Sequence, residues 1–325
     1  MSMVSDNMVS DALPDFRQIQ EAAARIAPHA VVTPVLRNDA LDTLCGAHLH
    51  FKCENLQRGG AFKFRGACNA VWALDEEQAT RGVVTHSSGN HGNALALAAA
   101  TRGITAHIVV PEGAVQAKVR AIQRAGAVLH RCAPTQAARE ALCAQLQRET
   151  GAVLVHPYAD TRVMAGQGTV ALELLGQLRG LDTLITPVGG GGLASGVAIA
   201  GHALDPSIRL FAAEPAGAAD TAESLARSAR VAGLVPDTVC DGLRTLVGER
   251  NLQALREHQV QVVTVSDDDT VAAMRLLWEE LKMVVEVSSA TVFAAIRKSP
   301  ALFAGRHIGV VLSGGNVDLD ALPWR

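Results

Sequence analysis

One lysine stands out chemically, because its neighbours would keep water away from its amine. Lys63 lies between Phe62 and Phe64, with glycines shortly before and after it. An ammonium group that is partly removed from water has a lowered pKa and becomes a usable nucleophile and base. The alternative is a strand or helix-start lysine that extends its amine to solvent. This segment alone favours the alternative, so the other motifs must decide between the two.

A turn rich in serine, asparagine and histidine forms the second motif. The segment from Ser87 to Asn93 connects an expected buried strand to an alanine-rich helix. Backbone N–H groups at a helix N-terminus attract an anion such as a carboxylate, and Ser88, Asn90 and His91 add side-chain donors. A Gly/Asn turn with an N-cap serine is the alternative. The density of polar side chains favours a binding function.

Four successive glycines form the third motif. Gly189, Gly190, Gly191 and Gly192 separate an apolar strand from the helix expected over 193–204. Such a run presents N–H donors to a phosphate group. The spacing is not G-x-G-x-x-G, and no Lys-Ser/Thr follows, which counts against a dinucleotide or ATP as the principal ligand. A flexible loop is the weaker alternative, because both flanks are apolar.

Two further segments place polar groups where sites can form. Ser313 to Asn316 ends the last expected strand, and ligands bind at the carboxyl ends of parallel strands, although a plain turn is the commoner explanation. Glu214 and Asp220 flank a turn whose carbonyl groups could join them in binding Mg²⁺ or Ca²⁺. Two solvated acidic side chains explain this pair equally well.

The elements expected around these motifs alternate between strand and helix. The 325 residues, 49% of them apolar, are enough for two domains. Alternating strands and helices over 82–157 predict a small open parallel sheet, and the pattern restarts at a helix over 167–176 and closes with a strand over 308–312. We expect a helix over 66–74 as well, and irregular structure over 214–250.

Composition excludes several classes of protein. The net charge is −3 and there is no basic stripe, so nucleic acid and anionic membranes are unexpected partners. No apolar run reaches the ~18 residues of a membrane span. Residues 1–14 are expected to form a polar, disordered tail without an apolar signal core. The six cysteines lack a CxxC pair, which indicates reduced thiols and a cytoplasmic protein.

Four of the motifs together resemble one family, the fold-type II pyridoxal-phosphate enzymes, and within it the branch of serine/threonine dehydratases and serine racemase. They occur in the family's order and spacing, and the resemblance extends over roughly residues 16–325. The motifs are Phe62 to Ala67, Ser87 to Gly92, Gly189 to Leu193 and Ser313 to Asn316.

The resemblance implies an α/β fold with two open, mainly parallel sheets and flanking helices, like that of the tryptophan synthase β-subunit. A large domain that binds pyridoxal phosphate would comprise residues 1–75 and 160–325. A small mobile domain would comprise residues 76–159. Homodimers are expected.

The resemblance also implies which residues would hold the cofactor. Lys63 would bind it covalently as an imine and then act as the base on the substrate Cα. Phe62 would pack beside the ring, Asn90 would bond the phenolic oxygen and Ser313 would face the pyridine nitrogen. The phosphate would be held by Gly189, Gly190, Gly191, Gly192 and the Leu193 amide.

Substrate and metal residues are implied in the same way. The substrate carboxylate would be received by Ser88, Gly89, Asn90 and His91, with Arg139 close to the substrate. Ser88 matches a second acid/base on the face opposite Lys63. The divalent-cation ligands would be Glu214, the Ala218 carbonyl and Asp220.

Two positions depart from the family pattern. Val287 replaces the usual proline after Glu286, which alters the local loop and bears on substrate choice. Ala61 replaces the usual serine before Phe-Lys and removes one hydroxyl near the site.

The implied activity is that of a pyridoxal-phosphate-dependent ammonia-lyase. It would dehydrate and deaminate a small-molecule β-hydroxy amino acid by β-elimination to a 2-keto acid and ammonia. Serine, threonine, 3-hydroxyaspartate and phenylserine all fit. The alternative is a serine or aspartate racemase that uses Lys63 and Ser88 as opposed acid/bases. A remote alternative is a non-catalytic binder of a phosphorylated metabolite.

Overall fold

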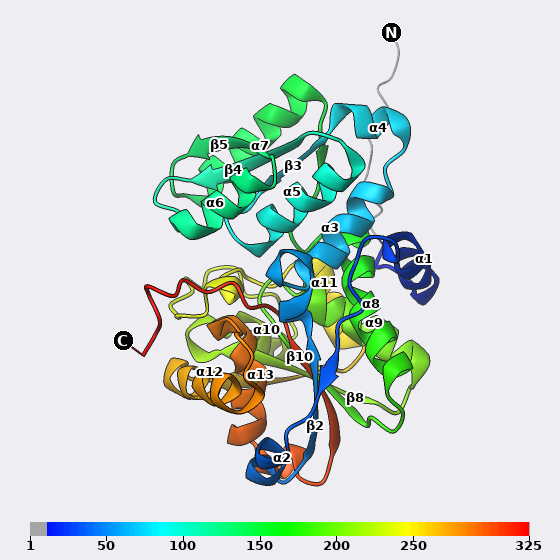
Figure 1. The fold of residues 1–325 in the computed structure, drawn as a ribbon, viewed down its shortest axis with the longest axis vertical. Coiled ribbons are helices and arrows are strands. Elements are labelled where there is room, and N and C mark those ends of the chain that lie inside the picture. The colour runs from blue at the N-terminus through cyan, green and yellow to red at the C-terminus, as the bar shows by residue number, and fades with distance from the viewer. Residues whose placement is uncertain (1–11, 325) are drawn as a thin grey trace.

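Two separate β-sheets organise the protein, whose structure is a computed structural model that describes residues 12–324 (Figure 1). The larger sheet has six strands in the order β1-β2-β10-β7-β8-β9, and the smaller has four in the order β5-β4-β3-β6. Every strand pair is parallel except β1 with β2. The prediction of an α/β fold with two open, mainly parallel sheets is therefore confirmed. Most of the expected polar tail lies outside the described residues.

The six-stranded sheet is covered by helices on both faces. Its strands are β1 (Val35–Leu36), β2 (His48–Cys53), β7 (Thr183–Pro187), β8 (Arg209–Pro215), β9 (Gln261–Val265) and β10 (His307–Leu312). One apolar cluster joins it to α1 (Phe16–Ile26), α8 (Thr161–Gln177), α9 (Gly192–Leu204) and α11 (Glu249–Glu257). A second cluster joins it to α2 (Asp39–Cys45), α12 (Asp267–Leu281), α13 (Val287–Lys298) and α14 (Pro300–Phe303). Burial of both faces explains the apolar runs in the central strands, such as Ile308–Leu312 of β10 and Leu210–Ala213 of β8.

The four-stranded sheet has the same layered arrangement on a smaller scale. Its strands are β3 (Val83–His86), β4 (Ala106–Pro111), β5 (Val128–Cys132) and β6 (Val153–Leu154). One apolar cluster contains residues of α3 (Lys63–Trp72), α4 (Glu76–Arg81), α5 (Asn90–Arg102) and α6 (Gln116–Arg124). The opposite face packs on α7 (Gln136–Thr150). Helix α3 thus lies between the two sheets (Figure 1).

Glycines allow α3 to approach α8, and α8 to approach α9, very closely. A Cβ on Gly66 of α3 would lie 2.7 Å from the Val163 carbonyl oxygen of α8, and one on Gly166 would lie 2.6 Å from the Gly66 Cα. A Cβ on Gly196 of α9 would lie 2.4 Å from the Met164 carbonyl oxygen of α8. Helices α3, α8 and α9 therefore form one rigid block, and α3 carries Lys63 on its first turn.

Element boundaries differ from the sequence predictions in three places. Helix α3 begins at Lys63 and not at residue 66, and α8 begins at Thr161, where the Asp160 side chain caps it. The segment 214–250, expected to be irregular, contains α10 (Asp220–Arg227). The Glu214 carboxylate accepts hydrogen bonds from the first-turn N–H groups of α10, and a cap from outside the helix leaves no local sequence signal.

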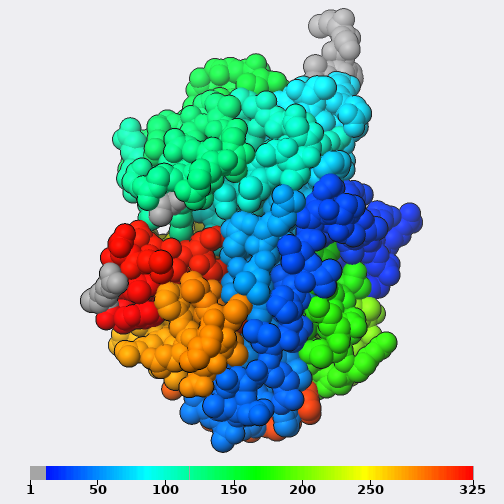
Figure 2. Space-filling model, in the orientation of Figure 1, coloured from blue at the N-terminus to red at the C-terminus, as the bar shows by residue number. Residues whose placement is uncertain are grey.

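The chain crosses between the two layers and finishes against them. In Figure 2 the C-terminal segment lies between the layer of the four-stranded sheet and the region of α12 and α13. Trp324 packs edge-on against Trp278 of α12, with ring centroids 5.3 Å apart. Between residues 12 and 324, no helix is long and apolar enough to cross a membrane.

Candidate active site

Lys63 lies on the first turn of α3 with its amine directed into the space between the two sheets. Its Nζ donates to the Pro157 carbonyl oxygen at 3.0 Å and lies 5.1 Å from the centroid of the Phe62 ring. Burial lowers the pKa of Lys63 to about 8, against the opposing effect of the Glu286 charge. A substantial fraction of such an amine is neutral near physiological pH, so Lys63 can act as a nucleophile and base.

The end of strand β10 holds the backbone beside Lys63. The Phe62 N–H donates to the Ser313 carbonyl oxygen at 3.0 Å, and Ala61 pairs with Gly314 as an isolated antiparallel bridge. Ser313 itself is only 3% exposed. The motifs that begin and end the predicted site are therefore in direct contact.

The Ser87–Asn93 turn connects β3 to α5 and is tightly folded. A Cβ on Gly92 would lie 2.1 Å from the Ser87 carbonyl oxygen, so only glycine fits there. Helix α5 begins at Asn90 without a side-chain cap, and Ser88 and Gly89 are partly exposed just before it. The uncapped N–H groups of this first turn are available to an anion.

Asn90 links this turn to the large layer. Its Nδ2 donates to both carboxylate oxygens of Glu286, at 2.8 and 3.1 Å, and its Oδ1 accepts from Asn316 Nδ2 at 3.0 Å. Burial raises the pKa of Glu286 to about 7, partly offset by the charge of Lys118. The sequence predicted Asn90, but Glu286 was noted only as part of a motif and Asn316 only as the end of a turn.

His91 is buried and electrically neutral. Burial, followed by the charge of Lys63, lowers its pKa well below the usual range. Its Nε2 lies 3.1 Å from the Val155 carbonyl oxygen. Since a carbonyl only accepts, Nε2 carries the hydrogen, and Nδ1, which has no hydrogen-bond partner, is an acceptor. Any contribution of His91 to carboxylate binding must then come from its backbone N–H.

The glycine run follows β7 and opens helix α9. Gly189 to Gly192 are buried beneath Tyr158 and Leu243: a Cβ on Gly190 would lie 2.4 Å from the Tyr158 ring, and one on Gly189 would lie 2.9 Å from the Leu243 Cα. Gly191 has φ +92°, which other residues rarely adopt. The Pro157 carbonyl accepts from Lys63, and the next residue, Tyr158, packs on the glycine run. These two adjacent residues therefore contact both the amine and the glycine run.

These residues fit pyridoxal phosphate. The glycine run presents N–H groups at a helix N-terminus, which suits a phosphate group. A neutral amine at Lys63 suits covalent attachment of an aldehyde. The buried Nδ1 of His91, close enough to Lys63 for that charge to lower its pKa, has no partner of its own and could bond a polar ligand group. Phe62 and Leu193, also predicted, lie beside Lys63 and on the first turn of α9 respectively.

Arg139 lies on α7, which packs on one face of the small sheet. It is partly buried, and its Nε is a buried donor without a hydrogen-bond partner. After burial, its charge is the largest influence that lowers the pKa of His86 at the end of β3. The next imidazole, His156, lies 5.6 Å from His86 between ring centroids, and burial lowers its pKa to about 4. Arg139 is thus a cation near neutral side chains.

The predicted metal ligands lie in a separate place, between β8 and α10. Glu214 is 0% and Asp220 1% exposed, and burial raises the pKa of both carboxyl groups, of Glu214 to about 7. Ala218 is buried between them in the chain. No group of three His, Cys, Asp or Glu side chains suited to a metal gathers anywhere in residues 12–324. A cation here would need main-chain oxygens as well as these two carboxylates.

Two further contacts around the site were not indicated by the sequence. Lys118 of α6 forms an ion pair with Asp241, which joins the small layer to the large one. Thr245 Oγ1 accepts from the Gly190 N–H at 3.1 Å. A cavity of about 210 Å³ lies nearby, lined by Gly89, Asn90 and Asn316 among others, but Lys63 and the glycine run do not line it.

Comparison with known proteins accords with this geometry. The family model described as "Pyridoxal-phosphate dependent enzyme" matches residues 26–314. A β-hydroxyaspartate dehydratase of Paracoccus denitrificans is 46% identical, over 96% of this chain and 99% of its own. A serine racemase of Arabidopsis thaliana is 48% identical, over 95% of each. The structure of maize serine racemase superimposes with a TM-score of 0.92 at 44% identity, over 95% of each chain.

These similarities identify the protein as an enzyme, so the remote alternative of a non-catalytic binder is not retained. They extend over nearly the whole chain, and the relatives include both a dehydratase and racemases. The chain belongs to the pyridoxal-phosphate-dependent enzymes of fold type II, in the branch of hydroxy-amino-acid dehydratases and serine racemases.

Proposed function

We propose that the protein dehydrates and deaminates a β-hydroxy amino acid to a 2-keto acid and ammonia. The observation that carries the proposal is the Lys63 amine, whose pKa burial lowers to about 8, directed into a space between two sheets. Such an amine can both hold the cofactor and accept the Cα proton. Pyridoxal phosphate, when bound, supplies the electron sink that makes this proton removable.

The protein's own groups would hold and orient the reactants. The glycine run with Leu193 would hold the cofactor phosphate, Phe62 would pack beside the ring and Asn90 would bond its phenolic oxygen. Ser313, a hydroxyl rather than a carboxylate, would face the pyridine nitrogen without keeping it protonated. Lys63 would then move the proton at Cα.

The uncapped first turn of α5 would bind the substrate carboxylate. Ser88 would supply a side-chain donor, and Gly89, Asn90 and His91 would supply backbone N–H groups, since the Asn90 amide donates to Glu286 and the His91 ring to Val155. Fixing the carboxylate there would orient the Cα–H bond toward Lys63, and orientation of this kind is a large part of enzymatic rate enhancement.

Among the four substrates that fit, we propose 3-hydroxyaspartate as the preferred one. It carries a second carboxylate, and Arg139 offers a partly buried cation with an unpartnered Nε. A buried N–H donor without an acceptor is costly, and the second carboxylate of the substrate would supply that acceptor. A relative 46% identical carries the name β-hydroxyaspartate dehydratase, which supports the same choice.

Keto-acid release tests this proposal directly. Serine, threonine, 3-hydroxyaspartate and phenylserine would each be supplied in both stereochemical series. We expect the highest kcat/KM with 3-hydroxyaspartate. In Arg139→Gln we expect a loss of roughly 100-fold for 3-hydroxyaspartate and much less for serine. Arg148→Gln, an exposed arginine of the same helix, is the matched control. Equal losses for both substrates would remove Arg139 from substrate choice.

Racemization is the second candidate function. Lys63 and Ser88 would act as opposed acid/bases, and relatives named serine racemase support this alternative. Chiral analysis of unreacted substrate in the same assays separates the two functions, because inversion without keto-acid release is expected only of a racemase.

We also propose that Glu214, the Ala218 carbonyl and Asp220 bind Mg²⁺ or Ca²⁺. Both carboxylates are buried and have raised pKa values, and the hydrogen bonds that they accept from residues 12–324 come from main-chain N–H groups, so a hard cation would stabilise them. EDTA should lower the melting temperature, and added Mg²⁺ or Ca²⁺ should restore it by mass action. A melting temperature that neither treatment changes would contradict the site.

Assembly, location and motion complete the proposal. We propose a homodimer in the cytoplasm, and the six free cysteines support a reducing location. We further propose that residues 76–159 move as a unit, with the Lys118–Asp241 ion pair among the contacts made on closure.

A further inference from the structure

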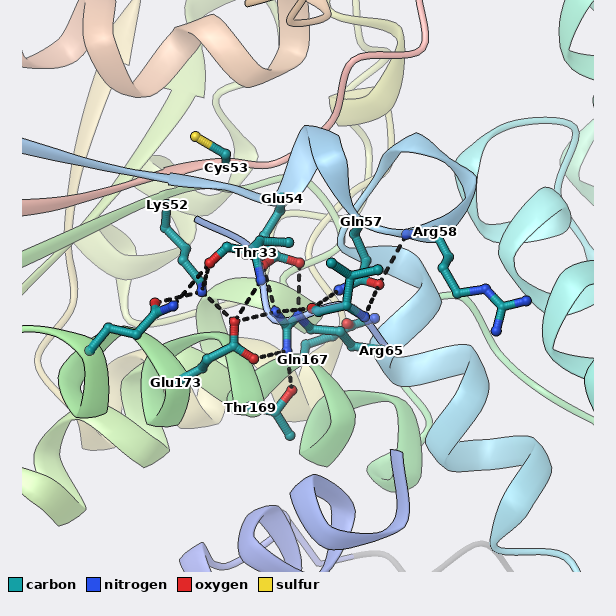
Figure 3. Close-up of polar contacts among 12 residues, drawn as sticks. Thr33, Lys52, Cys53, Glu54, Gln57, Arg58, Arg65, Gln167, Thr169 and Glu173 are labelled. Carbon is teal, nitrogen blue, oxygen red and sulfur yellow. Dashed lines mark hydrogen bonds and ion pairs between the residues drawn. The ribbon is translucent and has the colours of Figure 1, made fainter. Parts of the chain in front are cut away.

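A cluster of four charges, largely buried, joins the first turn of α3 to α8 and to the segment around the end of β2 (Figure 3). Lys52 lies in β2 and Glu54 directly after it, Arg65 lies on the first turn of α3, and Glu173 lies on α8. The side chains of Lys52 and Glu54 are 0% exposed, that of Arg65 2% and that of Glu173 18%. The two positive and two negative charges balance within the cluster.

Arg65 uses its entire guanidinium group in this cluster. Its Nε donates to one carboxylate oxygen of Glu54 at 2.8 Å and its Nη2 to the other at 2.7 Å, in a bidentate pair. Its remaining N–H groups donate to both carboxylate oxygens of Glu173, each at 3.0 Å, and to Thr169 Oγ1 at 3.4 Å. A planar fork with two carboxylates fixes the side chain in direction as well as in distance, which a lysine cannot do.

The first turn of α3 needs such a restraint. The helix starts without a side-chain cap, because Phe62 occupies the N-cap position. On the Ser313 side, main-chain bonds from Phe62 to Ser313 and from Gly315 to Gly60 hold the segment that leads into the helix, and within the first turn the Gly66 N–H donates to Gln167 of α8. On the other side Arg65 joins it to Glu54 and to α8. Since Lys63 lies on the same turn, the rotation of that turn determines where the Lys63 amine points.

Stability alone is a weak reason for such a cluster. Buried ion pairs often contribute no more to folding than well-packed apolar side chains of similar volume, since both charges lose their hydration. They do impose one geometry on the groups they join. We propose that Arg65, acting through Glu54, is a positioning residue for Lys63: the fork sets the orientation of the first turn of α3 and thereby the placement of the Lys63 amine.

The test compares two cations of the same cluster. Arg65→Lys keeps the charge but loses the fork. Lys52→Met is the matched control, because Lys52 is as deeply buried and bonds Glu173 but lies on β2, and its hydrogen bonds go to Thr33, Glu173 and Gln177 and not to Glu54. Glu54→Gln is a second test variant, which weakens the fork from the other side and serves if Arg65→Lys fails to fold.

Three readouts separate positioning from folding. The first is the absorbance of holoenzyme near ~410–420 nm, where lysine-bound cofactor absorbs, followed against pH. The second is the yield of borohydride-trapped cofactor on Lys63 by peptide mass. The third is the change in kcat compared with the change in KM. The melting temperature of each variant is measured alongside.

Positioning predicts a specific pattern. Arg65→Lys and Glu54→Gln should shift the pH midpoint of the absorbance band, reduce trapping and lower kcat on the order of 100-fold, with a smaller change in KM. Lys52→Met should lower the melting temperature and leave the band, trapping and kcat near wild type. The proposal would be overturned if Lys52→Met lost the band, the trapping and kcat as the test variants do, each in proportion to its fall in melting temperature. An unchanged band and an unchanged kcat in both test variants would overturn it as well.

The proposal rests on Lys63 being the amine that binds the cofactor, and the experiment tells the two apart. If wild-type protein with added pyridoxal phosphate shows no band and no trapped Lys63, the proposed function itself fails. If wild type shows both and the test variants match it, only the positioning role of Arg65 fails.

Discussion

Two buried lysines lie close together in the chain and have opposite surroundings. Lys52 is 0% exposed, and its Nζ donates to the Thr33 carbonyl and to Gln177, each at 2.8 Å, and to the Glu173 carboxylate. Lys63 donates to the Pro157 carbonyl at 3.0 Å and has no carboxylate partner in the part of the chain that the structure describes. All three N–H donors of Lys52 have acceptors, whereas the buried amine of Lys63 has a single one among the described residues.

The difference explains why burial has different consequences at the two sites. Burial lowers the pKa of both lysines, but at Lys52 the hydrogen bond and charge of Glu173 oppose the effect. At Lys63 only the charge of Glu286 opposes it, and the pKa falls to about 8. A lysine with all three donors satisfied by acceptors is a structural cation, whereas a desolvated lysine with a spare donor is available for chemistry.

Replacing Lys63 should have the largest effect on turnover. In Lys63→Ala we expect turnover to fall by many orders of magnitude, because one amine both attaches the cofactor and takes the Cα proton. The melting temperature should change little, since a single hydrogen bond and no ion pair is lost. Keto-acid assays and the absorbance near ~410–420 nm check this. Turnover within tenfold of wild type would remove Lys63 from its role.

Replacing Lys52 should give the reverse result, a loss of stability with little loss of activity. Lys52→Met leaves Glu173 short of one cation, and we expect the free energy of unfolding to fall by about 3 kcal/mol, while Arg65 limits the loss. Activity per folded molecule should stay near wild type. Urea unfolding and active-site titration measure the two quantities. A variant that keeps its stability but loses turnover would reverse the assignment of the two lysines.

The sequence marked Lys63 as chemically special but gave no sign that Lys52 is buried among acceptors. Flanking phenylalanines and nearby glycines marked Lys63, and the strand–turn–helix alternation predicted both sheets, because these signals are local. Four motifs in register also identified the family. Their roles in binding stay predictions, although the structure places Ser313 against Phe62 and Asn90 against Asn316.

The groups that sequence reasoning missed depend on contacts between distant parts of the chain. Glu286 bonds Asn90 from nearly the other end of the sequence, and Arg65 meets Glu173 of α8. Glu214, expected only as a metal ligand, also caps α10. No periodicity records such pairings, since each partner alone is an ordinary polar residue. A buried cluster of this kind becomes visible only when the fold brings the charges together.

A third variant compares Lys63 with the group expected on the opposite face of the substrate. Lys63 reaches Cα from one side, and Ser88 is the candidate acid on the other. Ser88→Ala should reduce racemization, and keto-acid release from D-isomers, by roughly 100-fold, but L-isomer elimination by less than tenfold. Keto-acid release from each enantiomer, with chiral analysis of the remainder, measures both. Equal losses for the two enantiomers with cofactor still bound would make Ser88 a binding residue only.

The smallest expected effect concerns two buried carboxyl groups, one beside each lysine. Near Lys63, burial raises the pKa of Glu286 to about 7. In the Lys52 cluster, burial acts on Glu173 in the same direction, but the hydrogen bonds and charges of Arg65 and Lys52 outweigh it and lower its pKa. The two groups should therefore contribute to stability in opposite pH ranges.

The signs follow from proton linkage. Glu286 binds its proton more tightly in the folded than in the unfolded protein, so its contribution to stability is fully present below the unfolded pKa of ~4.3 and is lost as the pH rises through about 7. Glu173 contributes stability above the unfolded pKa, which is lost as the pH falls below it. Glu286→Gln should therefore remove a decline of roughly 1–3 kcal/mol between pH 4.5 and 7.5. Glu173→Gln, the matched control, should leave that decline intact and alter stability only at more acidic pH. Urea unfolding at half-unit pH intervals measures both slopes, and a decline that persists unchanged in Glu286→Gln would show that another group near Lys63 carries the proton.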